Sequence, residues 1–157
     1  MAKGIFTGGP ALIVLILLIN LSFSACTNLE VKKPAGFAET ARATEYRAIS
    51  PEGILYRVRS VENYPAKDLE FWSKALKNQL AKEGYLLTAD GEEFTAGNRR
   101  GVLYEWGVRF GNEDFIYLTA IIVFDNRITI AEAGGEHTIY AKYRQPILES
   151  LKSITLN

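Results

Sequence analysis

Residue types that commonly carry catalysis or bind metals are scarce in this chain. It holds one histidine, one cysteine and one methionine among 157 residues. Zinc sites, haem sites and Cys-His nucleophiles need several such side chains at defined spacings, so we expect no metal, no cofactor and no enzyme activity. His137 would have to be the base of any Ser-His-Asp arrangement, but it follows Gly134-Gly135 at the start of a predicted helix, and no nucleophile motif accompanies it. We therefore expect His137 to have a surface or capping role.

Four arginines supply fixed positive charge for binding rather than for catalysis. Arg57 and Arg59 are two residues apart in a predicted strand near the sheet edge, so both lie on the same side of that strand, and Arg99-Arg100 occupy the tip of a predicted hairpin. Arginine is enriched at protein interfaces, but charged residues at a sheet edge also discourage aggregation between strands. The sequence predicts as partner-binding residues Arg57, Arg59, Arg99 and Arg100.

The overall charge argues against a nucleic-acid partner. The 18 basic and 18 acidic residues cancel, which leaves a formal net charge of zero. Nucleic-acid-binding domains usually carry a strong basic excess, so we predict no nucleic-acid binding.

A second functional hypothesis rests on aromatic residues. Tyr104, Trp106, Tyr140 and Tyr143 could form an aromatic face between sheet and helix that holds a small apolar or lipidic ligand. The same aromatics are also typical of an ordinary core. Glu105 and Arg109 share the other face of their strand, and we expect them to form a structural ion pair or a small functional cluster.

The first 25 residues have the organisation of a secretory signal peptide. Lys3 supplies a positive charge, and Ala11 to Ile19 is an unbroken apolar run that is too short to span a bilayer. The segment from Leu21 to Cys26 resembles the lipobox of bacterial lipoproteins, in which the cysteine is lipidated and becomes the mature N-terminus. Cleavage after Ala25 without lipidation, or an uncleaved anchor, are the alternatives.

The lipobox resemblance implies a location. An acylated Cys26 anchors the chain to a membrane, and two or more acyl chains hold stably. Thr27 follows the cysteine instead of Asp, which in Gram-negative lipoproteins implies the outer membrane, facing the periplasm. Residues 26–36 contain Pro34 and Gly36 and no apolar periodicity, so we expect a flexible tether there and one domain over residues 37–157.

Hydrophobic periodicity in the mature chain alternates between strands and two helices. Strands are predicted at 44–50, 54–61, 85–88, 93–96, 102–110, 115–124 and 127–133. Leu69, Trp72, Leu76 and Leu80 predict an amphipathic helix over 67–83, and a second helical stretch, which Pro146 should kink or restart, follows the Gly134-Gly135 turn. Connections of hairpin length predict an α+β fold in which helices sandwich a mostly antiparallel sheet of about six strands.

Several short motifs resemble the PsbP-like family, which includes the extrinsic PsbP protein of photosystem II, a small Ran-binding nuclear protein and many bacterial lipoproteins. The motifs are Trp72-x-x-x-Leu76, Gly84-Tyr85-x-Leu87, Gly101-x-x-Tyr104-x-Trp106, Tyr117-Leu118, Glu132-Ala133-x-Gly135 and Tyr140-x-x-Tyr143. They consist of packing and turn residues, so they bear on the fold more than on activity. The resemblance implies a PsbP-like α/β/α sandwich and a non-enzymatic binding or assembly module for a protein partner in a membrane-associated complex.

Overall fold

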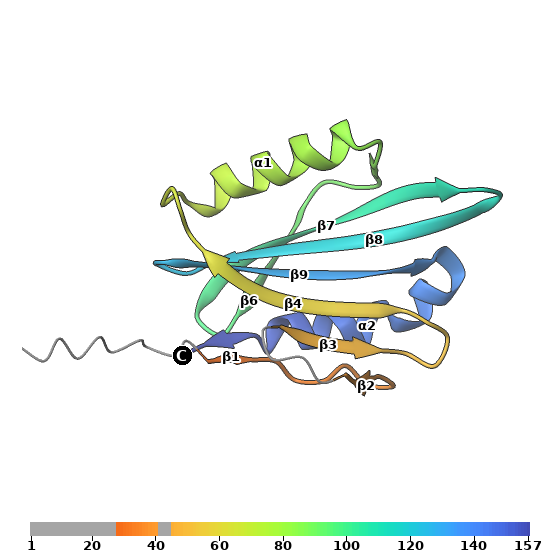
Figure 1. The fold of residues 1–157 in the computed structure, drawn as a ribbon, viewed down its shortest axis with the longest axis horizontal. Helices are drawn as coiled ribbons and strands as arrows, with labels where there is room; N and C mark the ends of the chain where they lie inside the picture. Colours follow the sequence, from red (N-terminus) through yellow and green to blue (C-terminus); the bar gives the residue numbers. More distant parts are fainter. Residues whose placement is uncertain (1–27, 41–44) are drawn as a thin grey trace, which may run out of the picture.

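A computed structural model describes residues 28–40 and 45–157 and shows two helices and ten strands in that part of the chain (Figure 1). The elements are β1 (Leu29–Glu30), β2 (Ala38–Glu39), β3 (Tyr46–Ile49), β4 (Leu55–Glu62), α1 (Leu69–Lys82), β5 (Leu86–Leu87), β6 (Glu92–Ala96), β7 (Arg99–Phe110), β8 (Glu113–Val123), β9 (Arg127–Glu136), α2 (His137–Lys152) and β10 (Thr155–Leu156).

One antiparallel sheet dominates the domain. Its strands follow the order β2-β3-β4-β9-β8-β7-β5, β6 also pairs with β7, and a separate pair joins β1 to β10. The two helices lie on opposite sides of this sheet (Figure 1). The predicted α+β sandwich is confirmed, although the main sheet has eight strands rather than about six because two-residue strands extend it at both edges.

The first helix forms where its periodicity predicts it. Asp68 caps it by accepting a hydrogen bond from the Phe71 amide at 2.9 Å, which satisfies one of the free N–H groups of the first turn. α1 packs over β5, β7 and β8, where Leu80 joins a buried cluster with Tyr104 and Trp106. It therefore covers the β7 side of one sheet face.

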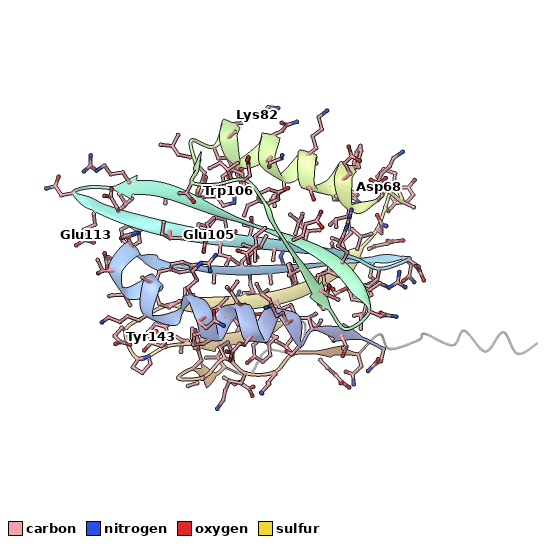
Figure 2. All side chains as sticks on the ribbon, turned by 180° about the vertical axis from the view of Figure 1, so that it is seen from behind. Asp68, Lys82, Glu105, Trp106, Glu113 and Tyr143 are labelled. Atoms are coloured by element: carbon pink, nitrogen blue, oxygen red, sulfur yellow. The ribbon has the colours of Figure 1, made fainter. Side chains whose placement is uncertain are left out.

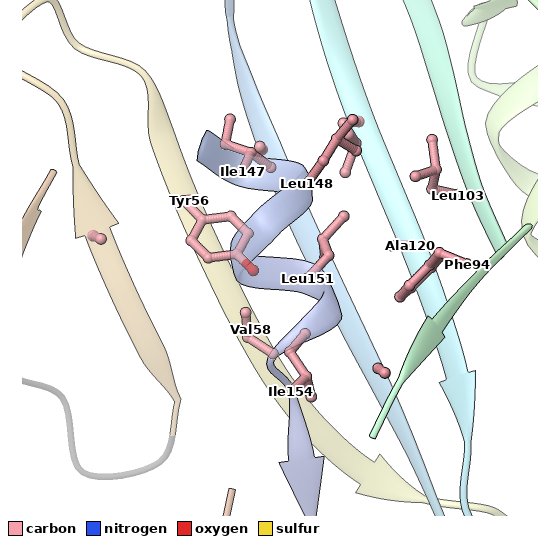
Figure 3. Packing of buried hydrophobic residues seen from close by; sticks show 14 of the residues in the cluster. Tyr56, Val58, Phe94, Leu103, Ala120, Ile147, Leu148, Leu151 and Ile154 are labelled. Carbon is pink, nitrogen blue, oxygen red and sulfur yellow. The ribbon is translucent and has the colours of Figure 1, made fainter. Parts of the chain in front are cut away.

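The larger core lies on the other face, under α2. Ile147, Leu151 and Ile154 are completely buried there against Tyr56 and Val58 of β4 (Figure 3). Burying each such side chain stabilises the fold by about 1.5–3 kcal/mol. α2 continues through Pro146 to Lys152, so the predicted restart at the proline does not occur.

The Gly134-Gly135 pair lies within β9 and is not the turn predicted before α2. β9 continues to Glu136, whose side chain caps α2. A Cβ atom on Gly135 would lie 2.1 Å from Cδ1 of Ile54, so glycine is needed there for close packing in the sheet.

Residues 28–36 are packed onto the domain, so the prediction of a flexible tether is wrong for this segment. The Asn28 amide donates to the Asn157 carbonyl at 2.8 Å, and the Lys32 amide donates to Ser153 Oγ at 2.9 Å. Pro34 is almost fully buried. Leu29 and Val31 pack against the main core, and this apolar contact offsets the entropy lost on ordering the chain.

The predicted signal peptide and Cys26 lie outside the described residues. Within the described part, no helix is long and apolar enough to cross a membrane.

Candidate functional site

A groove occupies the sheet face that carries α1, on the part formed by β3, β4, β9 and β8. Its volume is about 710 Å³, within the range of about 300–1,000 Å³ typical of binding sites. The side chains that matter most for its chemistry are Arg47, Ile49, Leu55, Arg57, Tyr117 and Glu132.

Strand register arranges the floor of the groove in two rows that run across the strands. The charged row consists of Arg47, Arg57 and Glu132, which are direct cross-strand neighbours on β3, β4 and β9. The apolar row contains Ile49, Leu55, Gly134 and Tyr117, which pair in the same way from β3 to β8. The rows are two residues apart along each strand, about 6.6–6.8 Å.

Glu132 ends the charged row and accepts most of the hydrogen bonds made there. Its Oε2 accepts hydrogen bonds from Arg57 Nε at 2.9 Å and Arg57 Nη2 at 2.5 Å, and Arg59 Nε lies 3.4 Å away. Its Oε1 accepts from the Tyr117 hydroxyl at 2.5 Å. Burial alone would raise the pKa of Glu132, but the hydrogen bonds from Tyr117 and Arg57 outweigh burial and hold it below its usual value.

Tyr117 remains a hydrogen-bond donor over a wide pH range. Burial raises the pKa of its hydroxyl, and the bond to the Glu132 carboxylate raises it further, because a tyrosinate beside that carboxylate would place two negative charges together. The ring of Tyr117 also contacts Tyr85, which follows α1, with centroids 5.5 Å apart. Tyr117 therefore links the groove to the end of α1.

The charge that solvent reaches in this region is mainly positive. The side chains of Arg47, Arg57 and Arg59 are 35–37% exposed, whereas those of Glu45 and Glu132 are each 13% exposed. Glu45 accepts from Arg47 Nε at 2.5 Å and lies 3.9 Å from Arg57 Nη1. Three guanidinium groups thus surround two largely covered carboxylates.

Of the four predicted binding arginines, Arg57 lines this groove, and Arg59 lies beside it, where it contacts Glu132. Arg57 and Arg59 point to the same side of β4, as predicted, but β4 is an interior strand between β3 and β9 and not an edge. Protection of a sheet edge therefore does not account for them.

Arg99 and Arg100 lie elsewhere, in the first residues of β7, three strands from β4. Arg99 forms two hydrogen bonds to Asp125, at 3.1 and 3.3 Å, and Arg100 lies 3.6 Å from Glu93. The structure therefore does not bring the four arginines together in one surface.

The expected pair between Glu105 and Arg109 does not form, because residues four apart in a strand are about 13 Å from each other. Glu105 Oε1 accepts instead from the Tyr140 hydroxyl at 2.5 Å and from Arg144 Nε at 2.8 Å. Arg109 lies 3.4 Å from Asp114 across the β7–β8 hairpin. The hydrogen bonds of Glu105 with Tyr140 and Arg144 hold α2 against β7, and we assign Glu105 a structural role.

The four aromatics proposed for a ligand-carrying face lie in two separate places. Tyr104 and Trp106 belong to the cluster under α1, whereas Tyr140 and Tyr143 are in α2. Figure 2 shows Trp106 and Tyr143 in these separate places. The indole N–H of Trp106 donates to Thr119 Oγ1 at 2.9 Å, so its polar atom is satisfied inside the core. The structure thus does not form the single aromatic face that the carrier hypothesis needs.

His137 is the exposed first residue of α2. Among residues 28–40 and 45–157, no group of three or more His, Cys, Asp or Glu side chains is arranged to hold a metal ion.

Sequence reasoning missed Arg47, Tyr117, Glu132 and Gly134 as parts of one site. They come from three strands, and only the register across β3, β4, β9 and β8 brings them together. One signal was available in the sequence. Charged residues alternate at 45 and 47 on one strand of the predicted hairpin and at 57 and 59 on the other.

No family model matches the chain, and no curated protein matches it in sequence. Solved structures similar in fold include two bacterial proteins. LpqN of Mycobacterium tuberculosis, described as involved in cell envelope biogenesis, has 12% identity and a TM-score of 0.65 over 83% of this chain and 84% of LpqN. A protein from Bacteroides thetaiotaomicron has 9% identity and a TM-score of 0.53 over 82% of this chain and 45% of that protein. These likenesses show the fold alone, and the PsbP-like resemblance stays a prediction.

Proposed function

We propose that this protein is a non-enzymatic, lipid-anchored protein of the bacterial cell envelope that binds a protein partner through the groove. The observation that carries the proposal is the uncovered sheet face at Arg57 and Glu132, where exposed guanidinium groups adjoin exposed apolar side chains. An apolar concave surface with a few convergent polar groups is the default candidate for a binding site. LpqN, described as involved in cell envelope biogenesis, adds support from fold similarity.

The groove is better suited to binding than to catalysis. Glu132 has a lowered pKa and Tyr117 a raised one, so neither exchanges a proton readily near neutral pH. The hydrogen bonds that Arg57 and Tyr117 donate to Glu132 also hold these groups in fixed positions. This fixed, charged surface favours recognition, in agreement with the binding and assembly role that the PsbP-like resemblance implies.

An acyl group on Cys26 would orient the domain on the membrane. Asn28 is hydrogen-bonded to Asn157, and it follows the cysteine by two residues, a distance of at most about 7 Å between the two Cα atoms. The β1–β10 end of the domain would then face the lipid, whereas the turn between β3 and β4 lies at the opposite end (Figure 1). Leu55 and the apolar row adjoin that turn, so the groove would face away from the membrane. With Thr27 after the cysteine, we propose the outer membrane and its periplasmic side.

Charge reversal at the groove tests this function. We expect Arg57→Glu with Arg59→Glu to reduce in-cell capture of the partner at least tenfold, whereas Arg99→Glu with Arg100→Glu leaves capture within twofold of wild type. Both double variants are compared by melting temperature, and Cys26→Ala reports whether capture needs the anchor. Equal loss of capture in the two double variants would contradict the groove as the binding surface.

A further inference from the structure

The groove offers two different kinds of contact at a fixed separation. The apolar row and the charged row are two residues apart on β3 and β4, which is about 6.6–6.8 Å. A ligand that uses both rows must carry an apolar group and a polar group at this distance.

The polar group must be anionic. Arg57 uses Nε and Nη2 for Glu132, and its Nη1 remains 3.9 Å from Glu45. Arg47 uses Nε for Glu45. The other guanidinium nitrogens of these two residues have no hydrogen bond among the described residues, and guanidinium groups bind carboxylates with two parallel bonds. Since the neighbouring carboxylates are largely covered, an added carboxylate meets mainly positive charge.

The apolar group has a defined place as well. Leu55 is 61% exposed and Ile49 is 37% exposed, although both are large hydrophobic residues. Gly134 lies between Leu55 and Tyr117 in the apolar row and has no side chain, which leaves a hollow over β9. An apolar side chain bound there would contact Leu55 and the ring of Tyr117, and its apolar surface would be removed from water.

We infer that the groove binds an extended segment of the partner protein in which an apolar side chain and an acidic side chain are two residues apart. In an extended chain such residues lie on the same side at about 6.6–6.8 Å, which equals the separation of the two rows. The groove is partly open to solvent, so an extended segment can enter it from the sheet face. The inference rests on the proposed function and specifies the partner's chemistry.

The test measures binding of defined peptides to the full chain in nanodiscs by fluorescence anisotropy. The probe is an extended threonine-rich peptide with a leucine followed two residues later by a glutamate. Matched peptides replace the glutamate by lysine, replace the leucine by serine, or place the two residues three apart. We expect the probe to bind at least tenfold more tightly than each matched peptide.

Protein variants connect this binding to the two rows. Arg47→Met removes one guanidinium, and Gly134→Val fills the hollow, where a Cβ atom has ordinary contacts of 3.4 Å to the Ile116 carbonyl and 3.6 Å to Tyr117. Each is expected to weaken probe binding at least tenfold without a change in melting temperature. Arg100→Met, at an exposed pair outside the groove, is the matched control and should bind as wild type does.

Equal binding of the probe and the lysine peptide, or unchanged binding in both groove variants, would overturn the inference. Binding of laurate at the groove with no binding of any peptide would also overturn it and would point to a lipidic ligand. If the peptides fail while partner capture still depends on Arg57 and Arg59, the inference fails and the proposed function stands. If the peptides do not bind and partner capture does not depend on Arg57 and Arg59, both the inference and the proposed function are contradicted.

Discussion

The hydroxyl of Tyr117 lies 2.5 Å from Oε1 of Glu132, diagonally across β8 and β9. This bond leaves Oε2 of Glu132 free to hold Arg57, so one carboxylate fixes an aromatic ring and a guanidinium group at the same time. The groove is therefore built around a carboxylate that is itself mostly covered. We expect its loss to affect stability as well as binding.

Glu132→Gln should destabilise the protein. The substitution leaves the half-buried Arg57 without its charged partner and weakens the bond from Tyr117, and lost hydrogen bonds to charged groups cost about 1–3 kcal/mol. Urea unfolding at neutral pH measures the change. Glu93→Gln, at the exposed pair with Arg100, should change the free energy of unfolding by less than about 0.5 kcal/mol. A similar loss in both variants would contradict the central role of Glu132.

Stability should fall in acid partly through Glu132. Its pKa is lower in the folded protein than in the unfolded chain, so its contribution is present above the ordinary glutamate pKa of about 4.3 and is lost as the pH falls through the lower, folded value. Melting temperatures recorded between neutral pH and pH 3 measure this loss. Glu132→Gln should show a shallower decline than wild type below about pH 4.5. Parallel curves would exclude this contribution.

The adjacent glycines of β9 should respond differently to alanine. A Cβ atom on Gly135 would overlap Ile54, so Gly135→Ala forces the core to shift and should cost about 1–3 kcal/mol. Gly134→Ala meets only ordinary contacts and should change stability by less than about 0.5 kcal/mol. Chemical denaturation of the two variants side by side makes the comparison. A large loss for Gly134→Ala would show that the hollow over β9 is not free.

The segment before β2 should be protected from hydrogen exchange. The amides of Asn28 and Lys32 donate to Asn157 and Ser153, and Ser150 Oγ donates to the Lys32 carbonyl at 2.6 Å. Local opening is needed before such amides exchange, so residues 28–37 should exchange more slowly than an unstructured chain. Hydrogen–deuterium exchange with peptide mapping measures this. Complete exchange of the segment at the earliest time point would contradict this packing and would support a flexible tether.

Local patterns predicted the elements whose stabilising residues are close in sequence. The spacing of Leu69, Leu76 and Leu80 and the acidic cap at Asp68 define α1, and the apolar run in β8 predicts a strand covered on both faces. β1 and β10 escaped prediction because each is two residues long and its partner is at the other end of the chain.

The groove could be predicted only in part, for a similar reason. The alternation of Arg57 and Arg59 placed both on one side of a strand, but the positions of Arg47 and Glu132 depend on how β3 and β9 align with β4. A shift of one residue in either pairing would turn these side chains to the opposite face. Gly134-Gly135 by itself indicates a turn, because the role of Gly135 depends on contact with Ile54, which is distant in sequence.

Site-specific photo-crosslinking in living cells would show directly whether a partner binds in the groove. A photoreactive amino acid at Leu55, which is 61% exposed in the apolar row, should give one discrete adduct that disappears with Arg57→Glu and Arg59→Glu. The same amino acid at Phe110, which is 79% exposed at the end of β7 and outside the groove, should give no such adduct. Adducts of equal yield at both positions, or no adduct at Leu55 in the membrane-bound protein, would contradict binding at the groove.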